Sequence, residues 1–153
     1  MTTADLLHNL IVSIALLCSS VFIQAGFTLL VLALLPRLSG WSQARHHYLA
    51  QGFAMTCLLL ILIINHLTQI HIWALAFYLL SYFPKFWNAQ YFAAQTYTTL
   101  GYGDLLLPPE RSTLAGWLAL TGLLMIGWST ALCAYLITKY FNGHASLGDR
   151  EGS

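Results

Sequence analysis

The sequence predicts an all-α membrane protein with three transmembrane helices and one short re-entrant helix. Of the 153 residues, 58% are apolar and only 7% are charged. Because a water-soluble domain needs about a quarter of its residues charged, most of the outer surface must face lipid. The net charge of +1 also excludes the basic footprint of a nucleic-acid-binding protein.

The first transmembrane helix is predicted within residues 1–36. The apolar run from Leu6 to Leu35 carries no charge, and at about 1.5 Å per residue it can cross a hydrocarbon core of about 30 Å. Asp5 stands before it and no Lys or Arg does, so the run lacks the basic start of a signal peptide. We therefore expect this helix to be retained, followed by a polar hinge over 37–48.

The remaining predicted elements occupy residues 49–141. A second transmembrane helix covers 49–83 and is closed by Pro84. The aromatic segment 86–98 has too few residues to cross, which predicts a re-entrant helix. A last transmembrane helix covers 112–141, and Asn142-Gly143 indicate its end before a tail over 142–153.

The positions of the Lys and Arg residues predict the orientation. Three spans place the two termini on opposite sides of the membrane. The side of the hinge and C-terminus holds Arg37, Arg45, Lys139 and Arg150. The other side holds only Lys85 and Arg111. Because Lys and Arg favour cytoplasmic loops, we expect a cell-membrane protein with its N-terminus outside and its C-terminus in the cytoplasm.

A glycine-bearing motif lies between the re-entrant helix and the last span, Thr98-Thr99-Leu100-Gly101-Tyr102-Gly103-Asp104. A bare cation in a protein interior costs on the order of tens of kcal/mol unless its lost water is replaced. Backbone carbonyls can replace that water if all of them point one way, and Gly101 and Gly103 can take the dihedrals that this requires. One segment supplies too few oxygens to encircle an ion, which predicts that four chains converge.

The motif resembles the T-V-G-Y-G-D selectivity filter of the potassium-channel pore family. The resemblance covers about residues 48–141 and implies an outer helix, a pore helix, a filter over 99–104 and an inner helix. The helix within 1–36 is then an addition to this module. The implied function is passive K⁺ conduction by a homotetramer in membrane lipid. The implied ion-coordinating residues are Thr99, Leu100, Gly101, Tyr102 and Gly103, with K⁺ held at the first four. Leu100 replaces the usual Val or Ile.

The resemblance also implies residues that support the filter. Tyr91 and Phe92 match an aromatic cuff that is often two tryptophans. Phe92 has no N–H for the Tyr102 hydroxyl, whereas Thr96 could still bond it. Gln95 stands where some members have a glutamate coupled to the filter aspartate, here Asp104.

Two glycines of the last helix, Gly122 and Gly127, have two interpretations. In the potassium-channel family the first glycine of such a pair is a gating hinge. Alternatively, small residues allow two helices to approach closely. The sequence does not decide between the hinge and the packing role.

Polar residues also cluster in the middle of the second span: Asn65, His66, Thr68, Gln69 and His71. Because polar groups are expensive in lipid, hydrogen bonds to another helix, such as the first span, are the favoured explanation. A pH sensor based on histidine and a metal site are the alternatives. No span carries the arginine repeat of a voltage sensor, so regulation by lipid, pH or an unidentified partner protein is expected.

Other functions remain open at this stage. The motif is also compatible with a non-selective cation channel. The membrane subunit of a potassium uptake system is a further alternative, although such subunits usually carry several degenerate filters in one chain. A membrane enzyme is not expected, because enzymatic activity would leave the glycine motif unexplained.

Overall fold

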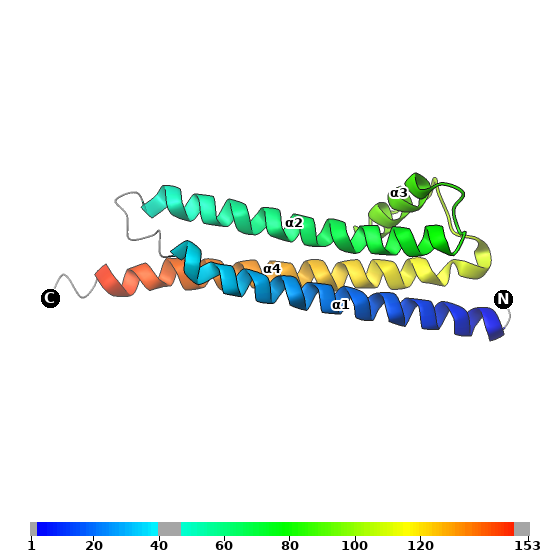
Figure 1. Cartoon of the computed structure of the whole chain (residues 1–153), viewed down its shortest axis with the longest axis horizontal. Coiled ribbons are helices and arrows are strands. Elements are labelled where there is room, and N and C mark those ends of the chain that lie inside the picture. Colours follow the sequence, from blue (N-terminus) through cyan, green and yellow to red (C-terminus); the bar gives the residue numbers. More distant parts are fainter. Residues whose placement is uncertain (1–2, 40–46, 149–153) are drawn as a thin grey trace.

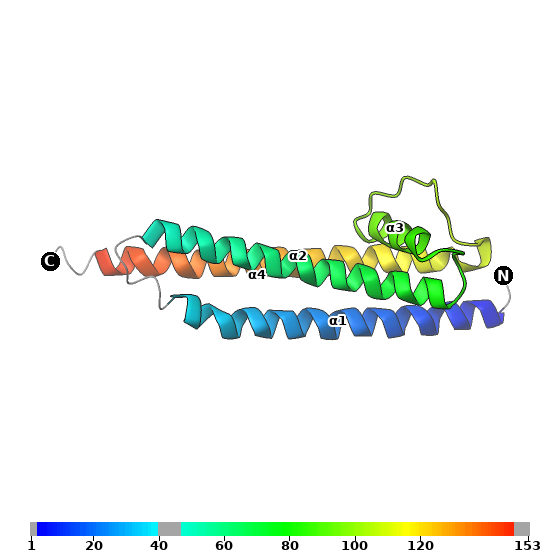
Figure 2. The same cartoon turned by 45° about the horizontal axis from the view of Figure 1, so that its top comes forward.

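The computed structural model describes residues 3–39 and 47–148, which form a helical bundle. Its elements in chain order are α1 (Thr3–Ser39), α2 (His47–Leu79), α3 (Phe86–Tyr97), the short helix η2 (Pro109–Arg111) and α4 (Thr113–Gly148). Figures 1 and 2 show the three long helices side by side, with α3 against the end of α2 that leads into it. The start of α1 and the end of α4 lie at opposite ends of the bundle (Figure 1).

Three helical segments of the described chain are long and apolar enough to cross a membrane. They are Thr3–Leu34 in α1, Gly52–Leu79 in α2, and Pro109–Lys139, which begins in η2 and continues into α4. Their surfaces expose large apolar side chains such as Phe22 and Leu29. The predicted all-α membrane fold with three spanning helices and one short helix is therefore confirmed.

The end of α2 differs from the predicted position. The helix stops at Leu79 rather than at residue 83. Ser81 adopts a left-handed conformation with φ 59°, and its N–H bonds to the Tyr78 carbonyl at 3.0 Å while the Tyr82 N–H bonds to the Phe77 carbonyl at 3.0 Å. These two bonds form a Schellman motif, and the Phe77 and Tyr82 rings make the apolar contact that accompanies it. The backbone of this motif, and not Pro84, ends the helix.

The predicted hinge and tail are also partly helical. α1 continues past residue 36 to Ser39, and α2 already begins at His47. α4 passes through Asn142-Gly143 and reaches Gly148, because a glycine inside a helix costs only about 1 kcal/mol and does not by itself stop it. Residues 40–46 of the predicted hinge and 149–153 of the predicted tail lie outside the described residues.

An aromatic core joins α3 to α2. Phe92 of α3 packs edge-on against Phe77 with 5.8 Å between ring centroids, and its ring lies 5.2 Å from that of Phe83. Leu114 and Leu118 of α4 are fully buried in the same cluster. Because lipid tails are as apolar as these side chains, close van der Waals packing in this cluster, and not exclusion of water, fixes the position of α3.

The N-terminal end of α1 is tied to the segment that leads into α4. The Asn9 amide nitrogen donates to the Glu110 carbonyl at 2.8 Å and to the Thr113 hydroxyl at 3.1 Å. Arg111 donates to the Asn9 side-chain oxygen at 2.9 Å and forms an ion pair with Asp5 at 3.3 Å. We call these contacts the N-terminal clamp of α1.

Candidate functional site

The short helix α3 presents its C-terminal end to the glycine-bearing segment at residues 98–104. Its first residue follows Pro84 and Lys85, and Lys85 has the extended conformation of a helix N-cap. One face of the helix, which includes Ala89 and Ala93, is buried against the core. At about 1.5 Å per residue the 12 residues of α3 span about 18 Å, which is too little to cross a membrane. The helix therefore ends, and the 98–104 segment begins, part of the way along the bundle (Figure 2).

The backbone of the 98–104 segment alternates in handedness. φ is positive at Thr99 (59°), Gly101 (55°) and Gly103 (78°), whereas Leu100 and Tyr102 are not among the positive-φ residues of the described chain. In an ordinary extended strand successive carbonyls point to opposite sides. Left-handed residues at every second position can turn the carbonyls of such a segment toward one side, which is the arrangement that cation coordination requires.

Thr99 was not recognised in the sequence as a left-handed residue. A residue with a β-branched side chain rarely adopts φ 59°, and such a conformation costs on the order of 1–3 kcal/mol unless the surroundings impose it. The surroundings here are the end of α3, where the Thr99 N–H bonds to the Thr96 carbonyl at 3.0 Å. Two further N–H groups, of Leu100 and Gly101, bond to the Gln95 carbonyl at 2.8 and 3.1 Å.

The Gln95 side chain supports the 98–104 segment through two hydrogen bonds. It is only 4% exposed. Its Oε1 accepts a hydrogen bond from the Tyr102 N–H at 2.9 Å, and its Nε2 donates to the Asp104 carboxylate at 3.4 Å. An amide can accept and donate at once, whereas an ionised glutamate could accept the first bond but could not donate the second. Gln95 and Asp104 are thus in direct contact in the structure.

Tyr91 holds the other side of the Asp104 carboxylate. The Tyr91 hydroxyl donates a hydrogen bond to Asp104, and this bond is the main reason why the pKa of the Asp104 carboxyl lies below its ordinary value. The same bond raises the pKa of Tyr91, because it stabilises the protonated phenol. The carboxylate at the end of the segment is therefore kept ionised.

The side chains of the segment itself point away from the protomer. Leu100 is 57% exposed and Tyr102 is 68% exposed. Phe92 is buried against the aromatic core, and within the described protomer no hydrogen bond joins Thr96 to Tyr102. The 98–104 segment thus contacts its own chain at the end of α3 and through Gln95 and Tyr91, whereas the Leu100 and Tyr102 side chains remain exposed.

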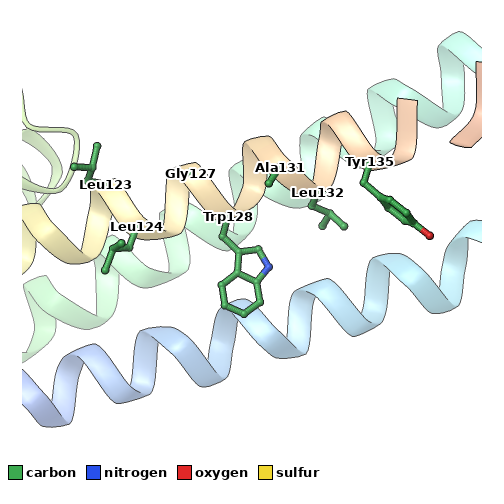
Figure 3. A pocket seen from close by; sticks show the side chains of 7 residues that line it. All are labelled: Leu123, Leu124, Gly127, Trp128, Ala131, Leu132 and Tyr135. Atoms are coloured by element: carbon green, nitrogen blue, oxygen red, sulfur yellow. The ribbon is translucent and has the colours of Figure 1, made fainter. Parts of the chain in front are cut away.

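The two glycines of α4 have different surroundings. A Cβ added to Gly122 would overlap the Tyr97 carbonyl oxygen and would lie 2.8 Å from its carbonyl carbon. Gly122 is therefore the point at which α4 touches the end of α3, which supports the packing interpretation of this glycine. A Cβ on Gly127 would meet nothing within 4 Å, and Figure 3 shows Gly127 in an open groove along α4 with Leu123 and Ala131.

The polar residues of the second span also find partners. Asn65 and Gln69 of α2 are fully buried and bond to Gln24 of α1 at 2.6 and 3.1 Å, which confirms the predicted hydrogen bonds to the first span. His66 faces the Tyr97 hydroxyl of α3 at 2.9 Å. His71 is exposed and bonds to the Leu67 carbonyl. His66 and His71 therefore lie in different environments.

A short helix and the glycine-bearing 98–104 segment thus lie between two helices that are long and apolar enough to span a membrane. In the comparison with family models, residues 65–139 match the family described as Ion channel. The match runs from the middle of α2 through α3 and the 98–104 segment into α4. No curated protein and no solved structure matched the chain. Residues 65–139 are therefore similar to the ion channel family.

Proposed function

We propose that the chain is one subunit of a homotetrameric, potassium-selective channel whose filter is the 98–104 segment. The observation that carries the proposal is the alternation of positive φ at Thr99, Gly101 and Gly103 directly after a short helix. Carbonyls aligned by this alternation can replace the hydration shell of a permeating ion. In this assignment K⁺ is coordinated by the backbone oxygens of residues 99–103 and by the Thr99 hydroxyl.

Four copies are required because a single segment cannot surround an ion. Non-helical backbone at membrane depth is tolerated only where protein or a water-filled path surrounds it. The exposed Leu100 and Tyr102 side chains supply the surface that neighbouring copies would cover. Four convergent α3 helices would also aim the negative ends of their dipoles at a shared cavity, where a cation is favoured.

The proposed orientation places the filter near the outer face of the cell membrane. α1 starts, and α3 lies, at the same end of the bundle (Figure 1), so an outer N-terminus puts the filter on the outside. Lys85 and Arg111 are then external. The exposed carboxylates Asp104 and Glu110 lie at the same end and raise the local cation concentration at the pore mouth.

Flux measurements in liposomes test this function. The purified protein is reconstituted with a potassium gradient, and influx of K⁺, Rb⁺ and Na⁺ is followed with and without Ba²⁺. The proposal predicts that K⁺ and Rb⁺ pass, that Na⁺ is rejected and that Ba²⁺ blocks. Equal flux of Na⁺ and K⁺ would leave a non-selective cation channel. Protein-free liposomes are the control for leakage.

Tyr91→Phe is expected to move the acid-side change in potassium current to higher pH. The substitution removes the hydrogen bond that keeps the pKa of Asp104 low, so the carboxylate is protonated earlier as pH falls. Above the ordinary pKa of an aspartate the two channels should agree, because Asp104 is ionised in both. Current is recorded against external pH for wild type, Tyr91→Phe and, as a control, Tyr78→Phe, which alters an exposed tyrosine of α2. Identical curves for wild type and Tyr91→Phe would contradict the assigned role.

A further inference from the structure

A chain of buried side-chain hydrogen bonds connects α1 to the end of α3. We call it the polar chain; its members are Gln24, Asn65, Gln69 and Tyr97, which are at most 1% exposed, and Ser129, which is 5% exposed. Gln24 Oε1 accepts from Asn65 at 2.6 Å and from Gln69 at 3.1 Å. The Tyr97 hydroxyl then donates to Gln69 Oε1 at 3.2 Å.

The polar groups of this chain leave little freedom for other arrangements. The Gln24 amide nitrogen donates to the Ser129 hydroxyl of α4 at 3.1 Å, so both ends of the Gln24 amide are used. The single Tyr97 hydroxyl proton goes to Gln69. His66 Nδ1, 2.9 Å from the same hydroxyl, must therefore carry a proton and donate it to the Tyr97 oxygen. These hydrogen bonds therefore join four helices. They lie in a buried region, where a polar group without a protein partner would have no water molecule to bond to.

Tyr97 lies between the polar chain and the proposed filter. It is the last residue of α3, and its carbonyl is the group that Gly122 of α4 approaches. Two residues later, Thr99 begins the left-handed alternation of the filter. A displacement of the Tyr97 side chain would consequently move the inner end of the filter.

α1 is attached to the rest of the chain at several points along its length. The N-terminal clamp at Asn9, Asp5 and Arg111 holds its N-terminal end, while the polar chain holds its middle. Between these two points Ser20 accepts a hydrogen bond from Trp73 of α2 at 3.3 Å. That bond is also buried, but it does not include Tyr97 and so offers a matched control.

We propose that α1 is a positioning element of the filter, which it aligns through the hydrogen-bonded sequence Gln24, Gln69, Tyr97. Neither Gln24 nor Gln69 touches the ion; both act through the hydroxyl of Tyr97. This inference rests on the proposed potassium-channel function. It gives the N-terminal helix a role in ion selectivity in addition to its role in the bundle.

The test compares Tyr97→Phe, Gln24→Leu and the double variant with wild type and Ser20→Ala. The readouts are the sodium-to-potassium permeability ratio in liposomes and the thermal stability of the purified protein. Tyr97→Phe and Gln24→Leu are each expected to raise the ratio by about tenfold, the size of effect that loss of one buried hydrogen bond can produce. The double variant is expected to resemble either single variant, because both interrupt the same chain. Ser20→Ala should lower stability and leave the ratio unchanged.

Two results would overturn the inference. The first is a selective wild type whose permeability ratio is unaffected by both Tyr97→Phe and Gln24→Leu, even if stability falls. The second is a ratio that Ser20→Ala raises as much as they do. Should Gln24→Leu not assemble, Tyr97→Phe decides alone, since it removes one oxygen and keeps the ring. A wild type that conducts Na⁺ and K⁺ equally would instead overturn the proposed function, and this inference with it.

Discussion

Gly103→Ala is expected to abolish discrimination between potassium and sodium while the helical bundle still forms. Gly103 has φ 78°, and holding a residue with a Cβ in left-handed backbone costs about 1–2 kcal/mol. Four copies around one axis raise this to about 4–8 kcal/mol. A thousandfold preference for one ion corresponds to only about 4 kcal/mol. The strain is therefore large enough for the backbone to relax and for its carbonyls to turn away from the ion.

Two controls separate backbone strain from loss of a glycine. Gly116→Ala alters a glycine of α4 that has no positive φ and nothing within 4 Å of an added Cβ, so selectivity should persist. A D-alanine placed at position 103 by semisynthesis favours positive φ and should also conduct selectively. Ion flux in liposomes measures all three proteins. Normal selectivity in Gly103→Ala would show that the left-handed backbone is not needed.

Gly122→Ala is expected to disrupt the contact between α4 and α3 and to reduce both protein stability and potassium flux. The new Cβ would overlap the Tyr97 carbonyl, which is backbone and cannot rotate away. Overpacking of this kind costs about 1–3 kcal/mol per protomer, and the gain of helix propensity from glycine to alanine returns about 1 kcal/mol at most. The net effect is destabilising, and it falls at Tyr97, next to the start of the 98–104 segment.

Gly127→Ala is the matched variant, since it makes the same change in the same helix where the protomer leaves space. If the role of Gly122 is to allow close packing of α4 on α3, Gly127→Ala should keep wild-type stability and selectivity, whereas Gly122→Ala should lose both. Thermal unfolding and flux measure the pair. A Gly122→Ala protein with normal stability and selectivity, but with reduced opening, would restore the hinge interpretation.

The sequence predicts the order of the elements because each signal is local. Three apolar runs and one short aromatic segment are visible without any partner, and the lack of a Cβ permits the positive φ of Gly101 and Gly103. The left-handed Thr99 has no such local sign. Its conformation depends on how the end of α3 is hydrogen-bonded, and in particular on the Gln95 carbonyl that receives two N–H groups.

The sequence predicts some of the contacts between helices but not others. Asn65 and Gln69 stand out as polar residues in a spanning helix, and a partner on the first span was expected. Gln24 is an equally conspicuous polar residue within the first apolar run, but it was not predicted to be the partner of Asn65 and Gln69. The choice of Tyr97 as a further partner depends on the rotation of α2 about its axis, which one sequence does not specify. The same holds for Gly122, whose neighbour is a backbone carbonyl.

Imaging of the purified, detergent-solubilised particle tests the central claim most directly. The account predicts four protomers related by a single fourfold axis, with residues 99–103 of each lining that axis and density for ions between them. α1 should lie on the outside of the assembly, against α2 and α4 of its own protomer. A particle with one or three protomers, or a fourfold particle in which Gly101 and Gly103 lie far from the axis, would contradict it.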